Sequence, residues 1–318
     1  MSCCGKPCSC EPEGTQVRLK VHCCAICRTD LHVIEGDLTQ QRLPIVPGHQ
    51  IVGTVDALGP DCRRLQLGQR MGVAWLRHTC GGCGFCTSGR ENLCESARFT
   101  GYHADGGFAE YALVAEDFAY PLPETFSDVE AAPLLCAGII GYRALKRSQV
   151  PAGGRLALYG FGSSAHVVIQ IARHRGCDVY VVTRGDKHRE LARRKGAVWV
   201  GQDASQMPVK VDSAIIFAPA GELIPPALEA LEKGGTLALA GIHMSPIPRM
   251  DYDRYVFYER DIHSVTCNTR DDGRGLLAEA AEIPIRPHTT SYPLADANQA
   301  LQDLKNDQIN GTGVLVMQ

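Results

Sequence analysis

The residues from Leu156 to Ala240 alternate between short apolar runs and amphipathic stretches, and this alternation limits the folds open to the chain. The apolar runs predict strands at residues 156–159, 179–182, 213–217 and 236–240. The stretches between them predict helices at residues 164–175, 187–195 and 224–231. A strand, a helix and a second strand in this order form a right-handed βαβ unit. The segment therefore predicts an α/β fold with a doubly wound parallel sheet and helices on both faces.

The turn after the first of these strands carries Gly160, Gly162 and Ala165 in the pattern G-x-G-x-x-A. Glycines are needed at such a turn because the chain bends sharply and its backbone has to approach a pyrophosphate, whose charge the helix N-terminus stabilises. Two glycines alone are common in strand-to-helix turns, but a strand before them and a helix after them make the motif specific. The pattern predicts a dinucleotide-binding site.

The end of the second predicted strand indicates which dinucleotide binds. A carboxylate at this point would hold a ribose 2′-hydroxyl and repel a 2′-phosphate. The chain has Thr183 and Arg184 instead, and a hydroxyl next to a guanidinium suits a phosphate, so we expect NADP(H) to be favoured over NAD(H). In the alternative, Arg184 stacks on the adenine and both cofactors bind, and the nearby Asp186 complicates the choice.

The chain outside this segment has a different pattern. Short strands broken by glycine and proline are predicted at residues 17–21, 50–55, 70–74 and 108–114, with a last strand at residues 313–317. Their even spacing favours a compact all-β barrel. The 318 residues are enough for two domains, and we expect residues 1–137 and 270–318 to form one and residues 138–269 the other.

Four cysteines stand in a glycine-rich stretch with the spacing C-x2-C-x2-C-x7-C: Cys80, Cys83, Cys86 and Cys94. Four thiolates at this spacing predict a tetrahedral zinc site without an open position, which organises a loop and does no chemistry. An iron–sulfur cluster is the alternative, but its cysteine run has a shorter last gap followed by proline, whereas Glu95 follows here.

Two further cysteines and a histidine flank this cluster: Cys27 and His49 precede it and Cys136 follows it. Two sulfurs and one nitrogen leave the fourth zinc position open for water or substrate. Taken singly, Cys136 has a plainer interpretation as a small buried hydrophobe and His49 as a hydrogen-bonded turn residue. Their combination favours a catalytic site, so we expect two Zn²⁺ per chain, one catalytic and one structural.

Composition argues against several kinds of partner and location. The net charge of −3, without a basic tract, gives no electrostatic reason to expect nucleic acid or an anionic membrane. No apolar stretch approaches the roughly twenty residues that a transmembrane helix needs. The chain begins Met1-Ser2-Cys3-Cys4 without an apolar signal segment, so its 15 cysteines favour a reducing cytoplasm. Residues 1–13, with Cys3, Cys4, Cys8 and Cys10, predict a flexible arm.

The barrel strands, the four-cysteine cluster, the Cys27/His49/Cys136 set and the dinucleotide turn occur in an order that resembles the zinc-dependent alcohol dehydrogenases of the medium-chain dehydrogenase/reductase superfamily, whose catalytic zinc has two cysteine ligands and one histidine. The similarity runs from about Val17 to the C-terminus, and residues 159–166 and 240–244 most resemble a bacterial subgroup. It implies a GroES-like β-barrel domain, a Rossmann-type domain, and a homo-oligomer (dimer or tetramer). It also implies hydride transfer between a small-molecule primary alcohol or aldehyde and a nicotinamide cofactor.

The resemblance also implies roles for individual residues. Thr29 is similar to the hydroxyl that takes the alcohol proton, and His32 to the base that passes it on to solvent. Asp30 resembles the carboxylate that orients the zinc-bound histidine. Arg28 is similar to the residue that contacts the cofactor pyrophosphate.

Three features depart from the family pattern. The segment before Cys27 is short, which predicts the loss of an opening strand. Gln50 follows the zinc histidine where relatives have glutamate, and a neutral amide leaves the site more positive. Residues 310–313 lack an arginine that many relatives present to the pyrophosphate, which leaves this contact to Arg28 and the helix N-terminus.

The sequence pattern allows two other functions. A polyol or secondary-alcohol dehydrogenase of the same fold usually has a carboxylate where Cys136 stands. A non-catalytic redox or metal-responsive relative would use the N-terminal cysteines instead, but every ligand and proton-relay position of the enzyme is present.

Overall fold

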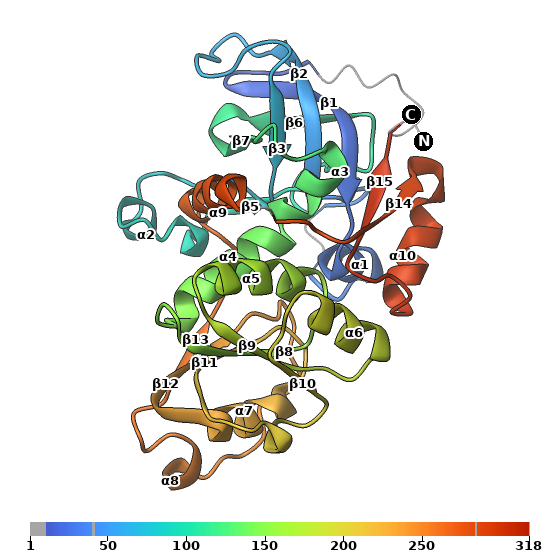
Figure 1. Ribbon diagram of the computed structural model, residues 1–318. Coiled ribbons are helices and arrows are strands. Elements are labelled where there is room, and N and C mark those ends of the chain that lie inside the picture. Colours follow the sequence, from blue (N-terminus) through green and yellow to red (C-terminus); the bar gives the residue numbers. More distant parts are fainter. Residues whose placement is uncertain (1–10, 40–41, 284, 318) are drawn as a thin grey trace. The chain divides into compact units, whose positions relative to one another are not determined.

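The computed structural model describes residues 11–39, 42–283 and 285–317, and the N-terminal cysteines Cys3, Cys4, Cys8 and Cys10 lie outside these residues. The chain forms two compact units, which Figure 1 shows in the colours of the sequence. The first unit comprises Met1–Ile139, Cys267–Glu282 and Arg286–Gln318, and the second comprises Ile140–Thr266 and Ile283–Ile285.

The first unit is built on a seven-stranded sheet in which β14, β15, β1, β2, β3 and β7 follow one another and β6 also pairs with β1. The strands are β1 (Gln16–Ala25), β2 (Gln50–Leu58), β3 (Arg70–Val73), β6 (Tyr111–Ala115), β7 (Ala119–Pro121), β14 (Thr289–Pro293) and β15 (Thr312–Val316). Strand β1 pairs antiparallel with β2, β6 and β15. The short segment before Cys27 thus still supplies a strand with several partners.

Alternation of buried residues explains which face of this sheet forms the core. Val17, Leu19 and Val21 of β1 are buried and pack with Ile51 and Met71 of neighbouring strands. The predicted strand at residues 108–114 is wrong in its first half, since β6 begins at Tyr111. Phe108 instead follows a glycine pair, and its amide donates to the Pro47 carbonyl at 3.0 Å, which directs the chain away from the sheet.

The remaining elements of the first unit are short or lie around the sheet. The helices are α1 (Arg28–Glu35), α2 (Gly84–Thr87), α3 (Asp128–Ala131), α9 (Arg270–Glu282) and α10 (Ala297–Lys305). Single 3-10 turns occur at η2 (Glu91–Leu93), η3 (Glu116–Phe118), η4 (Ala132–Leu135) and η7 (Leu294–Asp296), and β4 (Leu76–His78) pairs with β5 (Arg98–Phe99).

The second unit contains a six-stranded sheet in the order β10-β9-β8-β11-β12-β13, with parallel pairing throughout. Its strands are β8 (Arg155–Tyr159), β9 (Asp178–Val182), β10 (Trp199–Gly201), β11 (Val211–Ile216), β12 (Leu231–Leu239) and β13 (Asp261–Ser264). The order reverses direction at β8, where the chain first runs outward to β10 and then returns to β11. This confirms the predicted doubly wound parallel sheet.

Helices connect these strands: α5 (Ser163–His174), α6 (Asp186–Arg194), α7 (Ile224–Ala230) and α8 (Tyr252–Tyr255), with the turns η5 (Ala204–Gln206) and η6 (Gly221–Leu223). Helix α4 (Ala137–Ser148) begins in the first unit and ends in the second. Strand β12 starts at Leu231, five residues before the predicted start at Thr236, because the glycines at 234 and 235 hide the strand pattern. No helix in the described part of the chain is long and apolar enough to cross a lipid bilayer.

Candidate active site and metal centres

Cys27, His49 and Cys136 come together within the first unit. Cys27 is the N-cap of α1, His49 immediately precedes β2, and Cys136 follows η4. Their ligand atoms all lie within 4.8 Å of one another. The Cys27 Sγ and His49 Nε2 atoms are 3.4 Å apart.

This geometry fits a zinc ion. With a Zn–S bond of about 2.3 Å and a Zn–N bond of about 2.0 Å, a tetrahedral ion separates sulfur and nitrogen ligands by about 3.5 Å. The observed separation of 3.4 Å is close to that value. Three protein ligands leave the fourth tetrahedral position open, which is the arrangement of a catalytic site.

Asp30 holds the His49 ring in place. One carboxylate oxygen of Asp30 is 3.0 Å from His49 Nδ1 and also accepts from the Gly48 amide at 3.1 Å. The other accepts from the Cys27 amide at 2.9 Å. Because Nδ1 faces a carboxylate, Nε2 is left to face Cys27 and a metal.

The pKa values of the two thiols are shifted by their surroundings in the site. A hydrogen bond from the Cys136 thiol, aided by His49, holds the pKa of Cys27 well below its usual value. The same hydrogen bond, together with burial, raises the pKa of Cys136. A bound divalent cation would favour the thiolate form of both residues, because only thiolates ligate metals.

Besides Asp30, helix α1 carries three further residues with predicted roles. Thr29 is buried, and its amide donates to Cys27 Sγ at 3.3 Å. His32 lies one turn further on with its ring partly exposed, and its Nδ1 is 2.8 Å from Asp37 Oδ2. Arg28 is exposed at the first position of the helix. A hydroxyl near the metal ligands and a ring near solvent are therefore one turn apart.

Gln50, the residue after His49, has a buried side-chain amide. Its side chain is fully buried, and among the residues that the structure describes neither Oε1 nor Nε2 has a hydrogen-bond partner. Ile51 faces the apolar core, so Gln50 and Val52 face the opposite side of β2. That side is covered by η4, since Leu135 lies over Gly72, the residue that pairs with Val52. Cys136 is the next residue after Leu135.

An unpaired buried amide should destabilise the metal-free protein. We expect Gln50→Met to raise the free energy of unfolding of the metal-free protein by about 1–3 kcal/mol, because a side chain of similar length removes the unpaired polar atoms. Gln50→Glu should lower it, since it buries a charge. Urea unfolding of chelator-treated protein measures both. A less stable Gln50→Met protein would mean that the amide has a partner in solution.

An aromatic cluster adjoins the metal ligands. The Trp75 ring meets His49 edge-on at 4.9 Å between centroids, and it stacks on Phe99 at 5.1 Å and on Tyr102 at 5.9 Å. The Tyr102 hydroxyl donates to the Thr39 carbonyl. Aromatic contacts of this kind stabilise beyond the area they bury, so the cluster helps to fix the His49 ring.

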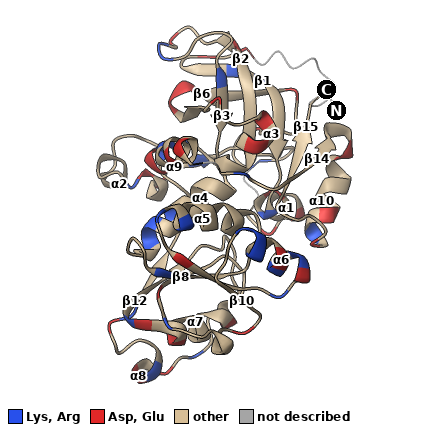
Figure 2. Ribbon diagram, viewed as in Figure 1, with Lys and Arg blue, Asp and Glu red and all other residues tan. Residues whose placement is uncertain are grey.

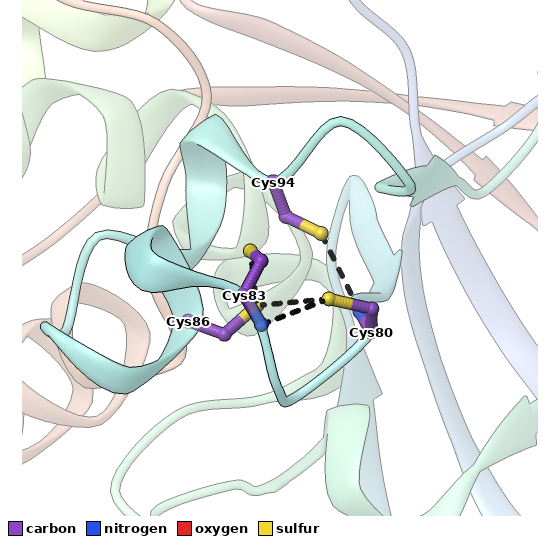
Figure 3. A group of neighbouring side chains, drawn as sticks. All are labelled: Cys80, Cys83, Cys86 and Cys94. Atoms are coloured by element: carbon purple, nitrogen blue, oxygen red, sulfur yellow. Dashed lines mark hydrogen bonds between the residues drawn. The ribbon is translucent and has the colours of Figure 1, made fainter.

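The four cysteines of the second group surround a common centre (Figure 3). Their sulfur atoms all lie within 4.8 Å of one another, with 3.9 Å between Cys80 and Cys86 and 3.5 Å between Cys83 and Cys86. A tetrahedral zinc with Zn–S bonds of about 2.3 Å places its sulfurs about 3.8 Å apart, so the group fits this ion. The backbone amides of Cys83 and Gly82 lower the pKa of Cys80 to about 6, which favours the thiolate.

An ion pair ties this cysteine lobe to α9. Glu91 lies between Cys86 and Cys94 and is buried. Its carboxylate accepts from the Arg270 backbone amide at 2.7 Å and from the Arg270 guanidinium at 2.5 Å and 3.0 Å. Burial alone would raise the pKa of Glu91, but the hydrogen bonds from Arg270 hold it below its usual value. The pair is therefore charged at neutral pH and anchors the lobe.

The predicted dinucleotide turn lies in the second unit, at the start of α5. Gly160 has a φ of 85°, which strains any residue with a side chain, and Gly162 is the N-cap of α5. A Cβ on Gly162 would meet no atom within 4 Å, so the space in front of the helix is open. The helix has no side-chain cap and no acidic residue in its first turn. These features fit a pyrophosphate at the helix N-terminus.

The residues predicted to choose the cofactor follow β9. Thr183 is buried, and its amide donates to the Gly201 carbonyl at 2.9 Å. Arg184 is exposed, and within the described residues its guanidinium has no hydrogen-bond or ion-pair partner. The turn therefore presents an exposed cation, whose charge also acts on the Glu222 carboxylate. Ala165, the third residue of the glycine motif, is buried in α5.

Two family models match successive parts of the chain. The model described as "Alcohol dehydrogenase GroES-like domain" matches residues 13–124, and "Zinc-binding dehydrogenase" matches residues 165–282. A probable alcohol dehydrogenase, AdhA, of Mycobacterium tuberculosis is 49% identical over 96% of this chain and 90% of its own length. The chain belongs to the zinc-dependent alcohol dehydrogenases of the medium-chain dehydrogenase/reductase superfamily.

Other alcohol dehydrogenases are similar at lower identity. An alcohol dehydrogenase of Geobacillus stearothermophilus is 35% identical over 94% of this chain and 91% of its own length. A solved structure of a cinnamyl alcohol dehydrogenase from Sorghum bicolor superposes with a TM-score of 0.89 at 27% identity, covering 96% of this chain and 91% of that one. The fold is therefore a GroES-like domain with a Rossmann-type domain, and the protein is an alcohol dehydrogenase.

Some contributors to the site are not evident from sequence motifs. Glu91 and Arg270 are far apart in the chain, and only the tertiary fold pairs them. Tyr102 and Phe99 join Trp75 through the turn between β5 and β6. For the aromatic cluster, the sequence offers one signal, which is that its aromatic residues lie close to the four cysteines in the chain.

Proposed function

We propose that this alcohol dehydrogenase transfers a hydride reversibly between a primary alcohol and NADP(H), with one catalytic and one structural zinc per chain. The observation that carries the proposal is the three-ligand group Cys27, His49 and Cys136, which converges on a point and leaves one tetrahedral position open. The four-cysteine group, which has no open position, is the proposed structural site.

Each residue near the open position has a proposed part in the reaction. Zinc held there would lower the pKa of the alcohol hydroxyl, and the nicotinamide would exchange the hydride. The Oγ1 atom of Thr29 takes the hydroxyl proton, and His32 releases it to solvent through Nε2, because its Nδ1 is engaged with Asp37. Asp30 keeps the His49 ring in one tautomer and orientation.

The neutral amide of Gln50 sets the charge of the site. With glutamine in place of glutamate, the thiolates of Cys27 and Cys136 are the only negative ligands within the described residues that offset the metal. We infer that the site holds an anionic ligand more firmly than a site with glutamate. Ligand exchange would then be slower than in relatives with glutamate.

The two parts of the chain have separate proposed tasks. Residues 1–137 and 270–318 form the catalytic domain with both zinc sites, and residues 138–269 bind the dinucleotide. Gly160, Gly162 and Ala165 let the pyrophosphate approach the α5 N-terminus, where backbone amides point at it. Arg28 supplies a further cation for the pyrophosphate.

Steady-state reduction of aliphatic and aromatic aldehydes, each with NADPH and with NADH, tests the function. We expect turnover with primary aldehydes, a higher kcat/KM for NADPH than for NADH, and loss of activity on zinc removal. Activity confined to ketones would overturn the primary-alcohol assignment.

Arg184→Ala tests the cofactor choice directly. We expect the variant to bind NADPH about ten- to a hundredfold more weakly, which corresponds to about 1.5–3 kcal/mol for a lost charged hydrogen bond, with NADH binding little changed. Fluorescence titration of each reduced cofactor measures both affinities. Equal weakening for both would indicate that Arg184 stacks on the adenine.

A homo-oligomer and a cytoplasmic location belong to the proposal as well. Strand β13 lies at the edge of its sheet, and Ile262 at this edge is 37% exposed. An edge strand with an exposed apolar side chain favours pairing with another copy. Light scattering after size-exclusion chromatography would distinguish a monomer from a dimer or tetramer.

A further inference from the structure

The side chain of Arg189 folds back from α6 onto the turn that follows β9. Helix α6 carries both basic and acidic residues (Figure 2). One of them, Arg189, is only 15% exposed although it lies in a surface helix. Its Nη1 donates to the Arg184 carbonyl at 2.6 Å. The guanidinium therefore holds the backbone of the residue that is proposed to bind the cofactor phosphate.

The same guanidinium forms an ion pair with Asp186, whose side chain is 93% exposed. The Gln202 carboxamide encloses Arg189 from the end of β10, with its oxygen, in the orientation that satisfies both groups, accepting at 2.5 Å and 3.2 Å. Arg189 is thus fixed on three sides, by a backbone carbonyl, a carboxylate and an amide. Its position is set by the fold and not by a ligand.

Gly185 lets this turn pack closely. A Cβ on Gly185 would lie 3.1 Å from the His188 ring, tighter than most real contacts. The turn at residues 184–186 is therefore compact, and Arg189 is bonded to its backbone. The Arg184 side chain is exposed, and its charge acts on the Glu222 carboxylate.

We propose that Arg189 is a positioning residue for cofactor choice, which neutralises Asp186 and fixes the Arg184 turn so that a 2′-phosphate is accepted. This inference rests on the proposed preference for NADP(H). A carboxylate near the end of this strand normally favours a ribose 2′-hydroxyl and repels a 2′-phosphate. Paired with Arg189, Asp186 contributes no net charge. Without Arg189, a charge of −1 would stand two residues from Arg184.

The test measures the binding of two ligands that differ only in the 2′-phosphate, adenosine 2′,5′-bisphosphate and adenosine 5′-monophosphate, by isothermal titration calorimetry with the zinc-loaded protein. The selectivity is the ratio of their dissociation constants. We expect Arg189→Met to lower the preference for the bisphosphate about tenfold, because an unpaired carboxylate repels the phosphate. Binding of the monophosphate should change little.

Further variants separate charge from folding. In Asp186→Asn/Arg189→Met the repelling carboxylate is gone, so the selectivity should return to within about threefold of the wild type. Arg189→Lys keeps the charge and should keep part of the preference. Arg193→Met, at an exposed position on the same helix, is the matched control and should behave as the wild type.

The outcomes distinguish this inference from the proposed function. A wild type that binds both ligands equally well would overturn the NADP(H) preference itself. A wild type that prefers the bisphosphate, with Arg189→Met unchanged, would overturn only the role of Arg189. A double variant as weak as Arg189→Met would show that the loss comes from a disturbed turn and would refute the neutralisation of Asp186.

Discussion

Replacing Cys136 with serine is expected to leave the protein folded and to lower kcat/KM by about a thousandfold or more. The thiol is one of three ligands at the open metal group, and a hydroxyl does not replace a thiolate as a zinc ligand. The charge stabilisation that a metal gives to the reacting oxygen amounts to several kcal/mol, which accounts for the size of the effect.

Elemental analysis and circular dichroism check this expectation together. The wild type should contain two zinc ions per chain and Cys136→Ser one, with the same circular dichroism spectrum. Cys177→Ser is the matched control, because Cys177 is a buried thiol of the second unit and belongs to neither metal group. A fully active wild type with a single zinc would refute the two-site assignment.

Cys83→Ser should have the opposite consequence. We expect it mainly to lower the stability of the protein and to change the activity per folded molecule less than Cys136→Ser does. The cysteine lobe holds few buried apolar residues, and α2 has none, so metal ligation has to hold it together. We expect the free energy of unfolding to fall by more than about 3 kcal/mol, or the protein to aggregate.

Thermal unfolding, with zinc content measured on the same sample, tests this variant. Cys62→Ser serves as the control, since Cys62 is partly buried but belongs to neither metal group. A visible absorption band in the wild type would indicate that an iron–sulfur cluster occupies this site in place of zinc. An unchanged melting temperature would mean that the lobe does not depend on its metal.

The parallel sheet could be predicted closely from the sequence, because its strands are buried on both faces and leave continuous apolar runs. Strands β8, β9 and β11 and helices α5 and α6 begin within two residues of their predicted starts. Strand β12 was harder to locate, since Gly234 and Gly235 interrupt its apolar run while its pairing with β11 continues.

Less of the first unit could be predicted from its sequence. Helix α1 has only eight residues and depends on Cys27 as its N-cap, so its periodicity is weak. The metal ligands could be found because residue type and spacing carry the chemistry. Three other features could not be found from the sequence, because each depends on which segments the tertiary fold brings together. They are the Glu91–Arg270 pair, the contacts of Arg189 and the buried amide of Gln50.

The discontinuous first unit has a consequence for the synthesis of the chain. Residues Cys23–Ala25 of β1 pair with β15, so this part of β1 lacks its β15 partner until residues 312–316 have been synthesised. Arg270 likewise reaches Glu91 only after the second unit has been translated. All the cysteine and histidine ligands of both metal groups, by contrast, lie at or before Cys136. The nascent chain therefore carries complete sets of zinc ligands while its first sheet is still open, and metal capture can precede closure of the fold.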